Sequence, residues 1–114
     1  MQDFRELKVW KKSRFLLLEV FEILETFPKH DFIGLTCQIR NSCIAIPANI
    51  ARGFSRKEQD ELVHFFQISM ASVNKLENYL RRAYHLRLMN NSNYQHLKRE
   101  TAEIMSLLGA WVQH

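Results

Sequence analysis

The stretch from Gly34 to Arg56 constrains the fold most strongly, because an apolar repeat of helical spacing runs through it and across a proline. The repeat advances in steps of three and four residues, which place side chains on one face of a helix, at Leu35, Ile39, Cys43, Ile46 and Ile50. Inside this pattern Pro47 has no N–H to donate to the carbonyl of Cys43, and its ring crowds the preceding turn. The sequence therefore predicts a buried helix that is kinked at Pro47.

Two further residues near the proline have predicted structural roles. Asn49 is close enough to hydrogen-bond a backbone group that Pro47 leaves free, or to bond a neighbouring helix. Gly53 supplies the left-handed residue that commonly closes a helix. The alternative interpretation is a helix that ends at Ile46, followed by a loop around Pro47, since proline is a strong helix terminator.

A first helix is predicted from about Leu7 to Thr26, where Phe27 and Pro28 stop it. Its predicted buried positions are Leu7, Trp10, Leu17, Phe21 and Leu24, and its apolar face is widened by Phe15, Leu18 and Val20. Apolar residues on two sides of one helix predict that one side faces the bundle and the other faces a second subunit. The alternative is that the additional apolar residues are ordinary surface scatter.

Capping motifs indicate where the last two helices begin. The S-x-x-E motif at Ser55 predicts a third helix that starts just after Arg56 and runs to about Leu88. The S-x-x-Q motif at Ser92 predicts the start of a fourth helix. The predicted core positions are Leu62, Phe65, Phe66, Ser69, Ser72, Val73, Leu76, Leu80 and Ala83 in the third helix and Tyr94, Leu97, Thr101, Ile104, Leu108 and Trp111 in the fourth.

The composition agrees with a single helical domain over residues 1–114. Only three glycines and two prolines occur among 114 residues, of which 46% are hydrophobic. Short connections between helices favour antiparallel neighbours. The sequence therefore predicts an all-α, up-down-up-down antiparallel four-helix bundle whose second helix is kinked. Long helices in a short chain also leave apolar surface that self-association would cover.

The chain is expected to be cytoplasmic and not to interact with a membrane. No apolar run approaches the roughly 20 residues that span a bilayer. Asp3 and Glu6 stand where a signal peptide would carry positive charge. Cys37 and Cys43, on one helix, would lie about 9 Å apart along its axis, too far for a disulfide. They are interpreted as small buried hydrophobic residues.

No motif for catalysis, a metal or a cofactor is recognisable, so the chain is predicted not to be an enzyme. The histidines show no pair at helical ligand spacing and no neighbouring cysteine cluster; they are His30, His64, His85, His96 and His114. The three glycines form no phosphate-binding loop. Each serine lies in a helical or capping context rather than on the strained turn that an exposed nucleophile needs.

Positive charge is the remaining chemical signal. The formal net charge is +4 and the sequence pI is about 9.3. The candidate nucleic-acid-binding residues are Lys8, Lys11, Lys12, Arg40, Arg52, Arg56 and Lys57. The alternative is that about half of the cations only pair with acids, chiefly Glu58, Glu61, Glu100 and Glu103. Within the first helix the cations precede the acids Glu19, Glu22 and Glu25, an order that opposes the helix dipole and suggests a use in function or subunit pairing.

The chain resembles a family of small bacterial four-helix-bundle proteins often encoded inside intervening sequences of large-subunit ribosomal RNA genes. In the central stretch the resemblance rests on Gly34, Leu35, Gln38, Ile39, Arg40, Ile46, Pro47, Asn49, Ile50, Ala51, Gly53 and Arg56. Elsewhere it rests on Phe4, Leu7, Val9, Trp10, Phe27 and Pro28, and on Phe65, Phe66, Ile68, Ser72, Leu76, Glu77 and Leu80. Three positions depart from the family pattern: Arg52 and Lys75 add positive charge, and Asn41 replaces a common arginine.

The resemblance implies a homo-oligomeric ring, expected to be a pentamer. It also suggests RNA or a reverse-transcriptase-like protein as a partner, because a relative of this fold serves as the accessory protein of retroelement reverse transcriptases. Glu77, in a stretch that the family retains, is predicted to pair with Arg40 or another buried arginine; the alternative is a solvated surface position.

Two functions follow as hypotheses. The first is a non-enzymatic oligomeric bundle that binds RNA through a basic surface. The second is a protein–protein adaptor or assembly scaffold that uses its apolar faces and does not itself bind nucleic acid.

Overall fold

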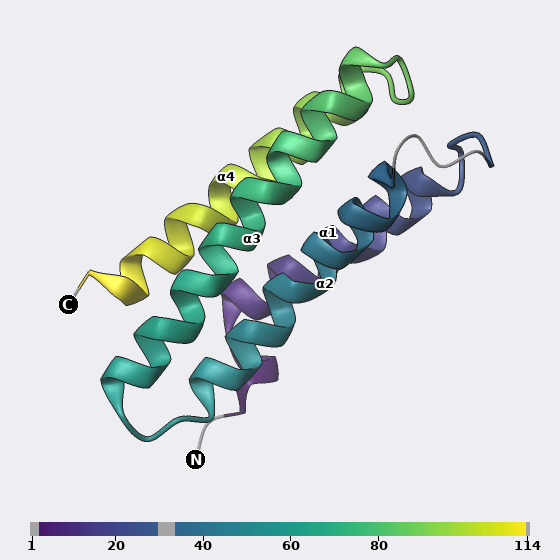
Figure 1. Ribbon diagram of the computed structural model, residues 1–114. Coiled ribbons are helices and arrows are strands. Elements are labelled where there is room, and N and C mark those ends of the chain that lie inside the picture. The colour runs from purple at the N-terminus through teal and green to yellow at the C-terminus, as the bar shows by residue number, and fades with distance from the viewer. Residues whose placement is uncertain (1–2, 30–33, 114) are drawn as a thin grey trace.

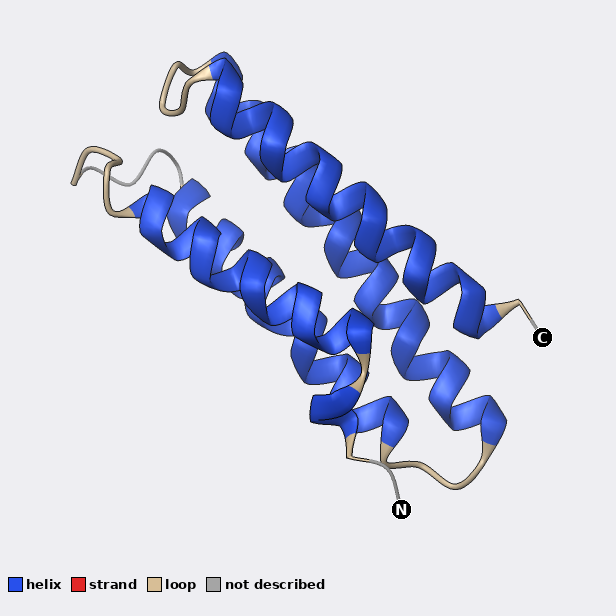
Figure 2. Ribbon diagram, turned by 180° about the vertical axis from the view of Figure 1, so that it is seen from behind, coloured by secondary structure: helices blue, strands red, loops and turns tan. Residues whose placement is uncertain are grey.

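The computed structural model describes residues 3–29 and 34–113, and all regular structure in these ranges is helical. A 3-10 helix, η1 (Phe4–Glu6), precedes α1 (Lys8–Leu24), α2 (Leu35–Phe54), α3 (Gln59–His85) and α4 (Asn91–Val112). Each helix packs against the next one, and α1 also packs against α4 (Figure 1). Seen from behind, the connection from α2 to α3 and the connection from α3 to α4 lie at opposite ends of the bundle (Figure 2). The predicted all-α, antiparallel four-helix bundle is confirmed, with dimensions of 44 × 23 × 20 Å.

The core is a continuous column of mostly aliphatic side chains between the four helices, because the helical repeat turns one face of each helix inward. Its fully buried large members include Leu16, Leu35, Ile39, Ile46, Ile50, Phe66, Leu76, Leu80, Leu97, Ile104 and Leu108. All five predicted core positions of the central stretch are buried. Phe65 and Trp111, which were also predicted to be core, are only half-buried.

Helix α2 runs across Pro47 to Phe54 without interruption, so the alternative of a helix ending at Ile46 is wrong. The Nδ2 of Asn49 donates to the carbonyl of Ala45 at 2.8 Å, within its own helix. The bond between helices comes from Ser69, whose buried hydroxyl donates to the carbonyl of Ile46 at 2.8 Å. The kink at Pro47 stays a prediction.

Gly53 does not close the helix in a left-handed conformation, so that prediction is wrong. It is buried in the last turn of α2, where an added Cβ would lie 2.9 Å from Cδ1 of Phe66 and 3.0 Å from Cβ of Phe65. The glycine therefore allows α2 and α3 to approach closely. The left-handed glycine is Gly34, with φ of +73°, directly before α2.

Neither predicted capping box forms. The hydroxyl of Ser55 donates back to the carbonyl of Arg52 at 2.9 Å, and α3 starts later than predicted, at Gln59. Helix α4 is capped by Asn90, whose Oδ1 accepts from the N–H of Asn93 at 2.7 Å. Asparagine is as good an N-cap as serine, so the motif alone could not locate the helix start.

Helix α3 ends at His85, short of the predicted Leu88, because the chain reverses at Arg87. Arg87 has a φ of +61°. The N–H of Leu88 donates to the carbonyl of Ala83 and that of Arg87 to the carbonyl of Tyr84, both at 2.9 Å. These two bonds form the Schellman arrangement that commonly ends a helix, with arginine at the position that favours glycine.

Helix α1 is rotated about its axis relative to the prediction. Of the apolar residues predicted for this helix only Val20 and Leu24 are buried, and the residues that face the core are Val9, Ser13, Leu16, Val20 and Leu24. The apolar pattern of the sequence did not reveal this face because a polar residue, Ser13, lies in the middle of it. The hydroxyl of Ser13 donates to the carbonyl of Trp10 at 2.8 Å and can therefore be buried. The other predicted buried positions are half-buried at the edges of the helix.

The two cysteines have different environments. Cys43 is fully buried, as predicted, and burial raises the pKa of its thiol to about 12. Cys37 is exposed, which contradicts the prediction. It lies on the outer side of α2, away from the face formed by Leu35 and Ile39.

Candidate nucleic-acid interface

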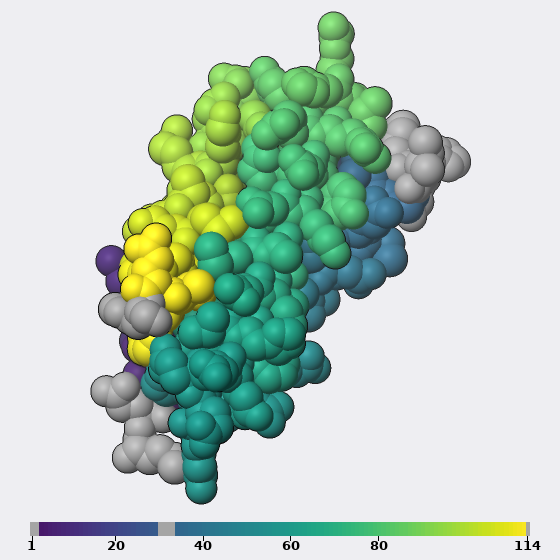
Figure 3. Space-filling model, turned by 60° about the vertical axis from the view of Figure 1, so that its left-hand side comes forward, coloured from purple at the N-terminus to yellow at the C-terminus, as the bar shows by residue number. Residues whose placement is uncertain are grey.

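Acidic residues are scarce along α2 and α3. No Asp or Glu occurs between residues 34 and 57, and the only one between 62 and 99 is Glu77. These two helices are neighbours in the bundle, and a space-filling view shows α3 between α4 and α2 (Figure 3). Among the described residues, the surface along the pair, here called the α2–α3 face, therefore carries acids only at the start of α3, at Glu58, Asp60 and Glu61, apart from Glu77.

Glu77 is occupied by contacts away from this face. Its Oε2 accepts from Nη2 of Arg81 at 2.7 Å, one turn further along α3. Its Oε1 accepts from the hydroxyl of Tyr94 on α4 at 3.0 Å. The predicted pairing with Arg40 is wrong, and the arginine that pairs is exposed rather than buried. Glu77 joins α3 to α4 and does not neutralise the α2–α3 face.

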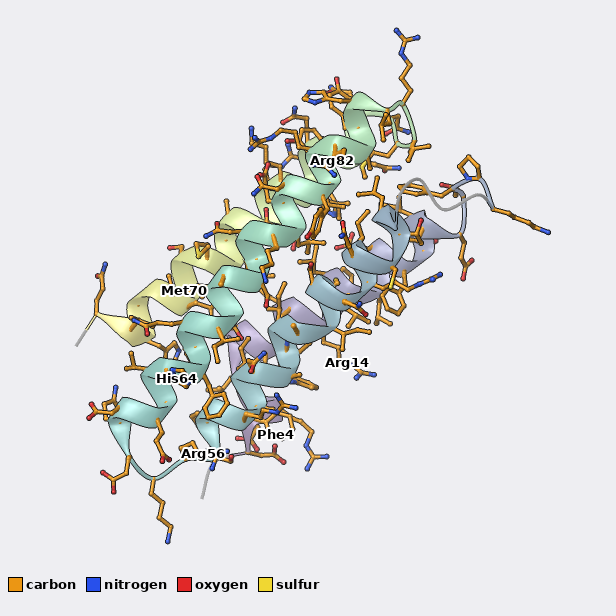
Figure 4. All side chains as sticks on the ribbon, in the orientation of Figure 1. Phe4, Arg14, Arg56, His64, Met70 and Arg82 are labelled. Carbon is orange, nitrogen blue, oxygen red and sulfur yellow. The ribbon has the colours of Figure 1, made fainter. Side chains whose placement is uncertain are left out.

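Four exposed cations, Arg52, Arg56, Lys75 and Arg82, come from α2, α3 and the loop between them. Within the described part of the chain, none of them forms an ion pair. The guanidinium of Arg56 lies 5.0 Å from the ring centroid of Phe65, which orients it by a cation–π contact. Arg56 and Arg82 lie near opposite ends of the bundle (Figure 4). These charges are available to an external anion.

A polar groove of about 230 Å³ lies between the middle parts of the two helices. It is lined by Gln38, Asn41, Ser42, Ala45, Ser72, Lys75 and Tyr79. Asn and Gln amides can pair with base edges, tyrosine rings can stack on bases, and lysine can contact phosphate. The groove therefore offers, in one place, the three kinds of contact that proteins make to single-stranded RNA.

The structure does not bring all the predicted cations together. Lys12 points to α4, where its Nζ lies 2.9 Å from Oε2 of Glu103. This hydrogen bond raises the pKa of Lys12 and lowers that of Glu103, and the charge of Lys8 adds to the lowering. Lys8 and Lys11 are exposed on α1, which lies diagonally across the bundle from α3.

Arg40 and Lys57 have different surroundings. The guanidinium of Arg40 lies 6.0 Å from the ring centroid of Phe21, which places it at the seam between α1 and α2. Lys57 is exposed in the connection before α3, beside Arg56. Of the predicted set, Arg52, Arg56 and Lys57 thus belong to the α2–α3 face, whereas the three α1 lysines and Arg40 do not.

The groove was not predicted from the sequence, and Lys75 was not counted among the binding residues. The signal that could have found them is the long run without acids, because it singles out one pair of helices. The alternative was that many cations pair with Glu58, Glu61, Glu100 and Glu103. Within the described residues only one such ion pair forms, between Lys12 and Glu103.

In the described ranges, 3–29 and 34–113, no group of three or more His, Cys, Asp or Glu side chains is placed to hold a metal ion. Two of the five histidines, His30 and His114, lie outside these ranges. None of the helices described is both long enough and apolar enough to span a bilayer.

Comparisons with known proteins agree with this architecture. The family model described as 23S rRNA-intervening sequence protein matches residues 5–110. A crystal structure of a protein of unknown function from the S23 ribosomal protein family of Bacteroides thetaiotaomicron VPI-5482 superposes with a TM-score of 0.86. Its sequence identity is 18%, and the match covers 93% of this chain and 99% of that chain. No match was found among curated proteins.

Proposed function

The chain belongs to the family of 23S rRNA-intervening sequence proteins, and on this premise we propose that it is a non-enzymatic, self-associating bundle that binds RNA through the α2–α3 face. The observation that carries the proposal is a set of cations, Arg52, Lys75 and Arg82, that form no ion pair within the described residues. Apart from Glu77, which pairs with Arg81, the described acids of this face lie at one end. A polyanion brought to this face meets little negative charge along most of its length.

The contacts available on the face favour single-stranded RNA or loops over a regular duplex. The amides of Gln38 and Asn41 and the ring of Tyr79 share one groove with Lys75. Base edges and base faces reach such groups only when the bases are unstacked, whereas an A-form duplex presents mainly its backbone. We therefore expect an unpaired RNA segment to bind more tightly than a duplex of equal length.

Self-association is part of the same proposal, and the family resemblance sets the expected number of copies at five. Several copies of the α2–α3 face in one assembly would engage one RNA molecule together, which raises its apparent affinity without new contacts. A reverse-transcriptase-like protein stays a predicted further partner.

The test is a salt titration of binding to a fluorescently labelled single-stranded RNA, with anisotropy as the readout. Arg52→Gln with Lys75→Gln is compared with wild type. Each lost phosphate contact should reduce the slope of log affinity against log salt by about 0.7 for a single strand. The double variant should therefore bind more weakly, with a slope smaller by about 1.4.

The matched control is Lys98→Gln with Arg99→Gln. It removes the same charge from exposed positions on α4. If only net charge matters, both double variants lose the same affinity, and the assignment to the α2–α3 face is wrong. If wild type does not bind any RNA at low salt, the RNA-binding proposal itself is wrong.

The adaptor hypothesis is separated by a pull-down from native lysate with and without nuclease. Partners that bind through RNA are lost after nuclease treatment. A protein that stays bound after nuclease and at high salt would favour direct protein recognition instead, through exposed apolar residues such as Ile44, Ile68 and Leu86.

A further inference from the structure

Helix α1 carries an exposed stripe whose side chains form no ion pair or side-chain hydrogen bond within the described residues, although the charge of Lys8 also acts on Glu103 of α4. The stripe follows alternating steps of three and four residues, the spacing of one helix face. Its members are all exposed, and they are Lys8, Lys11, Phe15, Leu18, Glu22 and Glu25. Phe15 is 61% exposed and Leu18 54%, the highest values among the large hydrophobic residues described. Two apolar residues thus stand between a basic half and an acidic half.

We propose that this stripe, here called the α1 stripe, pairs with the α1 stripe of a second copy in antiparallel orientation. The two-fold axis passes between Phe15 and Leu18. In this register Phe15 lies opposite Leu18 of the partner subunit, and Lys11 lies opposite Glu22 of the partner subunit. Lys8 lies opposite Glu25 of the partner subunit. The contact is isologous, so each of these pairs occurs twice.

Charge complementarity selects a second copy as the occupant. Within the described residues, Lys11, Glu22 and Glu25 make no ion pair or side-chain hydrogen bond. The basic and acidic ends are more than two turns apart, too far to pair with each other along one helix. An antiparallel copy matches both ends at once, whereas a parallel copy would place lysine against lysine and glutamate against glutamate.

The proposed pairing also accounts for the order of charges along α1, in which cations come first and acids last. Cations near the start of a helix and acids near its end oppose the helix dipole. The exposed charges of the stripe, Lys8, Lys11, Glu22 and Glu25, all follow this unfavourable order. In the antiparallel pair each set faces the opposite charge of the partner subunit.

This inference deepens the self-association in the proposed function and does not depend on RNA binding. A two-fold contact joins copies in pairs, so a ring of five formed through other surfaces would be joined to a second ring. The contact uses one helix from each subunit and is at the small end of stable interfaces. We therefore expect a concentration-dependent association with a dissociation constant of about 1 µM to 1 mM.

The experiment is a charge exchange at Lys11 and Glu22, followed by native mass spectrometry and sedimentation velocity. Lys11→Glu alone and Glu22→Lys alone each place like charges opposite one another, so each variant should lose pairing. Mixing the two single variants should restore it, because every opposed pair is then complementary. The double variant Lys11→Glu/Glu22→Lys should also pair.

Circular dichroism provides the folding control, since neither side chain forms an ion pair or a side-chain hydrogen bond with the described residues and both variants should melt like wild type. Wild type that stays unpaired at about 500 µM, or an odd-numbered assembly unaffected by either single variant, would overturn the proposal. So would single variants that lose pairing and do not recover it when mixed. The RNA titration on the same variants is read separately, so failure of RNA binding leaves this result intact.

Discussion

The Nε2 of His96 lies 2.6 Å from Oε2 of Glu19, across the interface between α1 and α4. About two turns away along both helices, Lys12 pairs with Glu103 in the same antiparallel register. The basic half of α1 therefore faces an acid from α4, and its acidic half faces a histidine. Part of the charge order that opposes the α1 dipole is compensated inside the bundle.

The contact between His96 and Glu19 is expected to be weakly stabilising. A double-mutant cycle with Glu19→Ala and His96→Ala should give a coupling free energy below about 1 kcal/mol, because both side chains are partly exposed. Urea unfolding of wild type, the two single variants and the double variant measures this coupling, and a coupling of zero would contradict a stabilising contact.

Gly53→Ala is expected to destabilise the bundle by about 1–3 kcal/mol, because its Cβ must displace the ring of Phe66 or the backbone of α3. Gly109→Ala is the matched control. Gly109 is also helical, but an added Cβ meets nothing within 4 Å. This control should stabilise the protein by up to about 1 kcal/mol through helix propensity alone. The free energies of unfolding in urea should move in opposite directions.

Arg87→Gly is expected to stabilise the protein by about 1 kcal/mol, because glycine adopts the left-handed conformation at the end of α3 without steric cost. Arg99→Gly removes the same charge from the middle of α4. It should cost about 1 kcal/mol, because glycine is a poor helix former. Thermal melts of the two variants measure both effects. A loss of stability in Arg87→Gly would show that the arginine side chain stabilises the protein by more than its left-handed backbone conformation costs.

The two cysteines should differ sharply in reactivity towards a thiol reagent. Only the thiolate reacts, and burial raises the pKa of Cys43 to about 12, so this thiol stays protonated and covered in the native state. Cys37 is exposed and should react. Labelling with Ellman's reagent near pH 8 should modify one thiol in native protein and two after denaturation. Cys37→Ser should remove the fast reaction, and rapid labelling of that variant would contradict the packing of Cys43.

The raised pKa of Cys43 also makes the free energy of unfolding depend on pH. The unfolded state releases the Cys43 proton near the ordinary thiol value, whereas the folded state holds it to about pH 12. The unfolded state therefore binds fewer protons in this range, and the free energy of unfolding falls as pH rises. Compared with Cys43→Val, wild type should lose stability more steeply, by up to about 1.4 kcal/mol per pH unit.

Prediction from sequence succeeded where the signal is local. The repeat from Leu35 to Ile50 located α2 and its buried face, and the patterns in the last two helices named nearly all their core residues. Prediction of the buried face failed for α1 because Ser13 is polar and was not expected in the core. Its hydroxyl is satisfied by a hydrogen bond within its own helix, so the side chain can be buried. The positive character of the chain was visible in the sequence, but the cations that share a face were not.

By itself the sequence determined four amphipathic helices, their order and a surplus of positive charge, since periodicity and charge depend only on neighbours along the chain. The tertiary structure decided which side of α1 is buried, why Gly53 must be small and which acids neutralise which cations. Those outcomes depend on distances between side chains of different helices, and no spacing within one helix encodes them. Bringing α2 beside α3 turned a run without acids into a cationic face, and leaving one side of α1 uncovered exposed a stripe with a basic half and an acidic half.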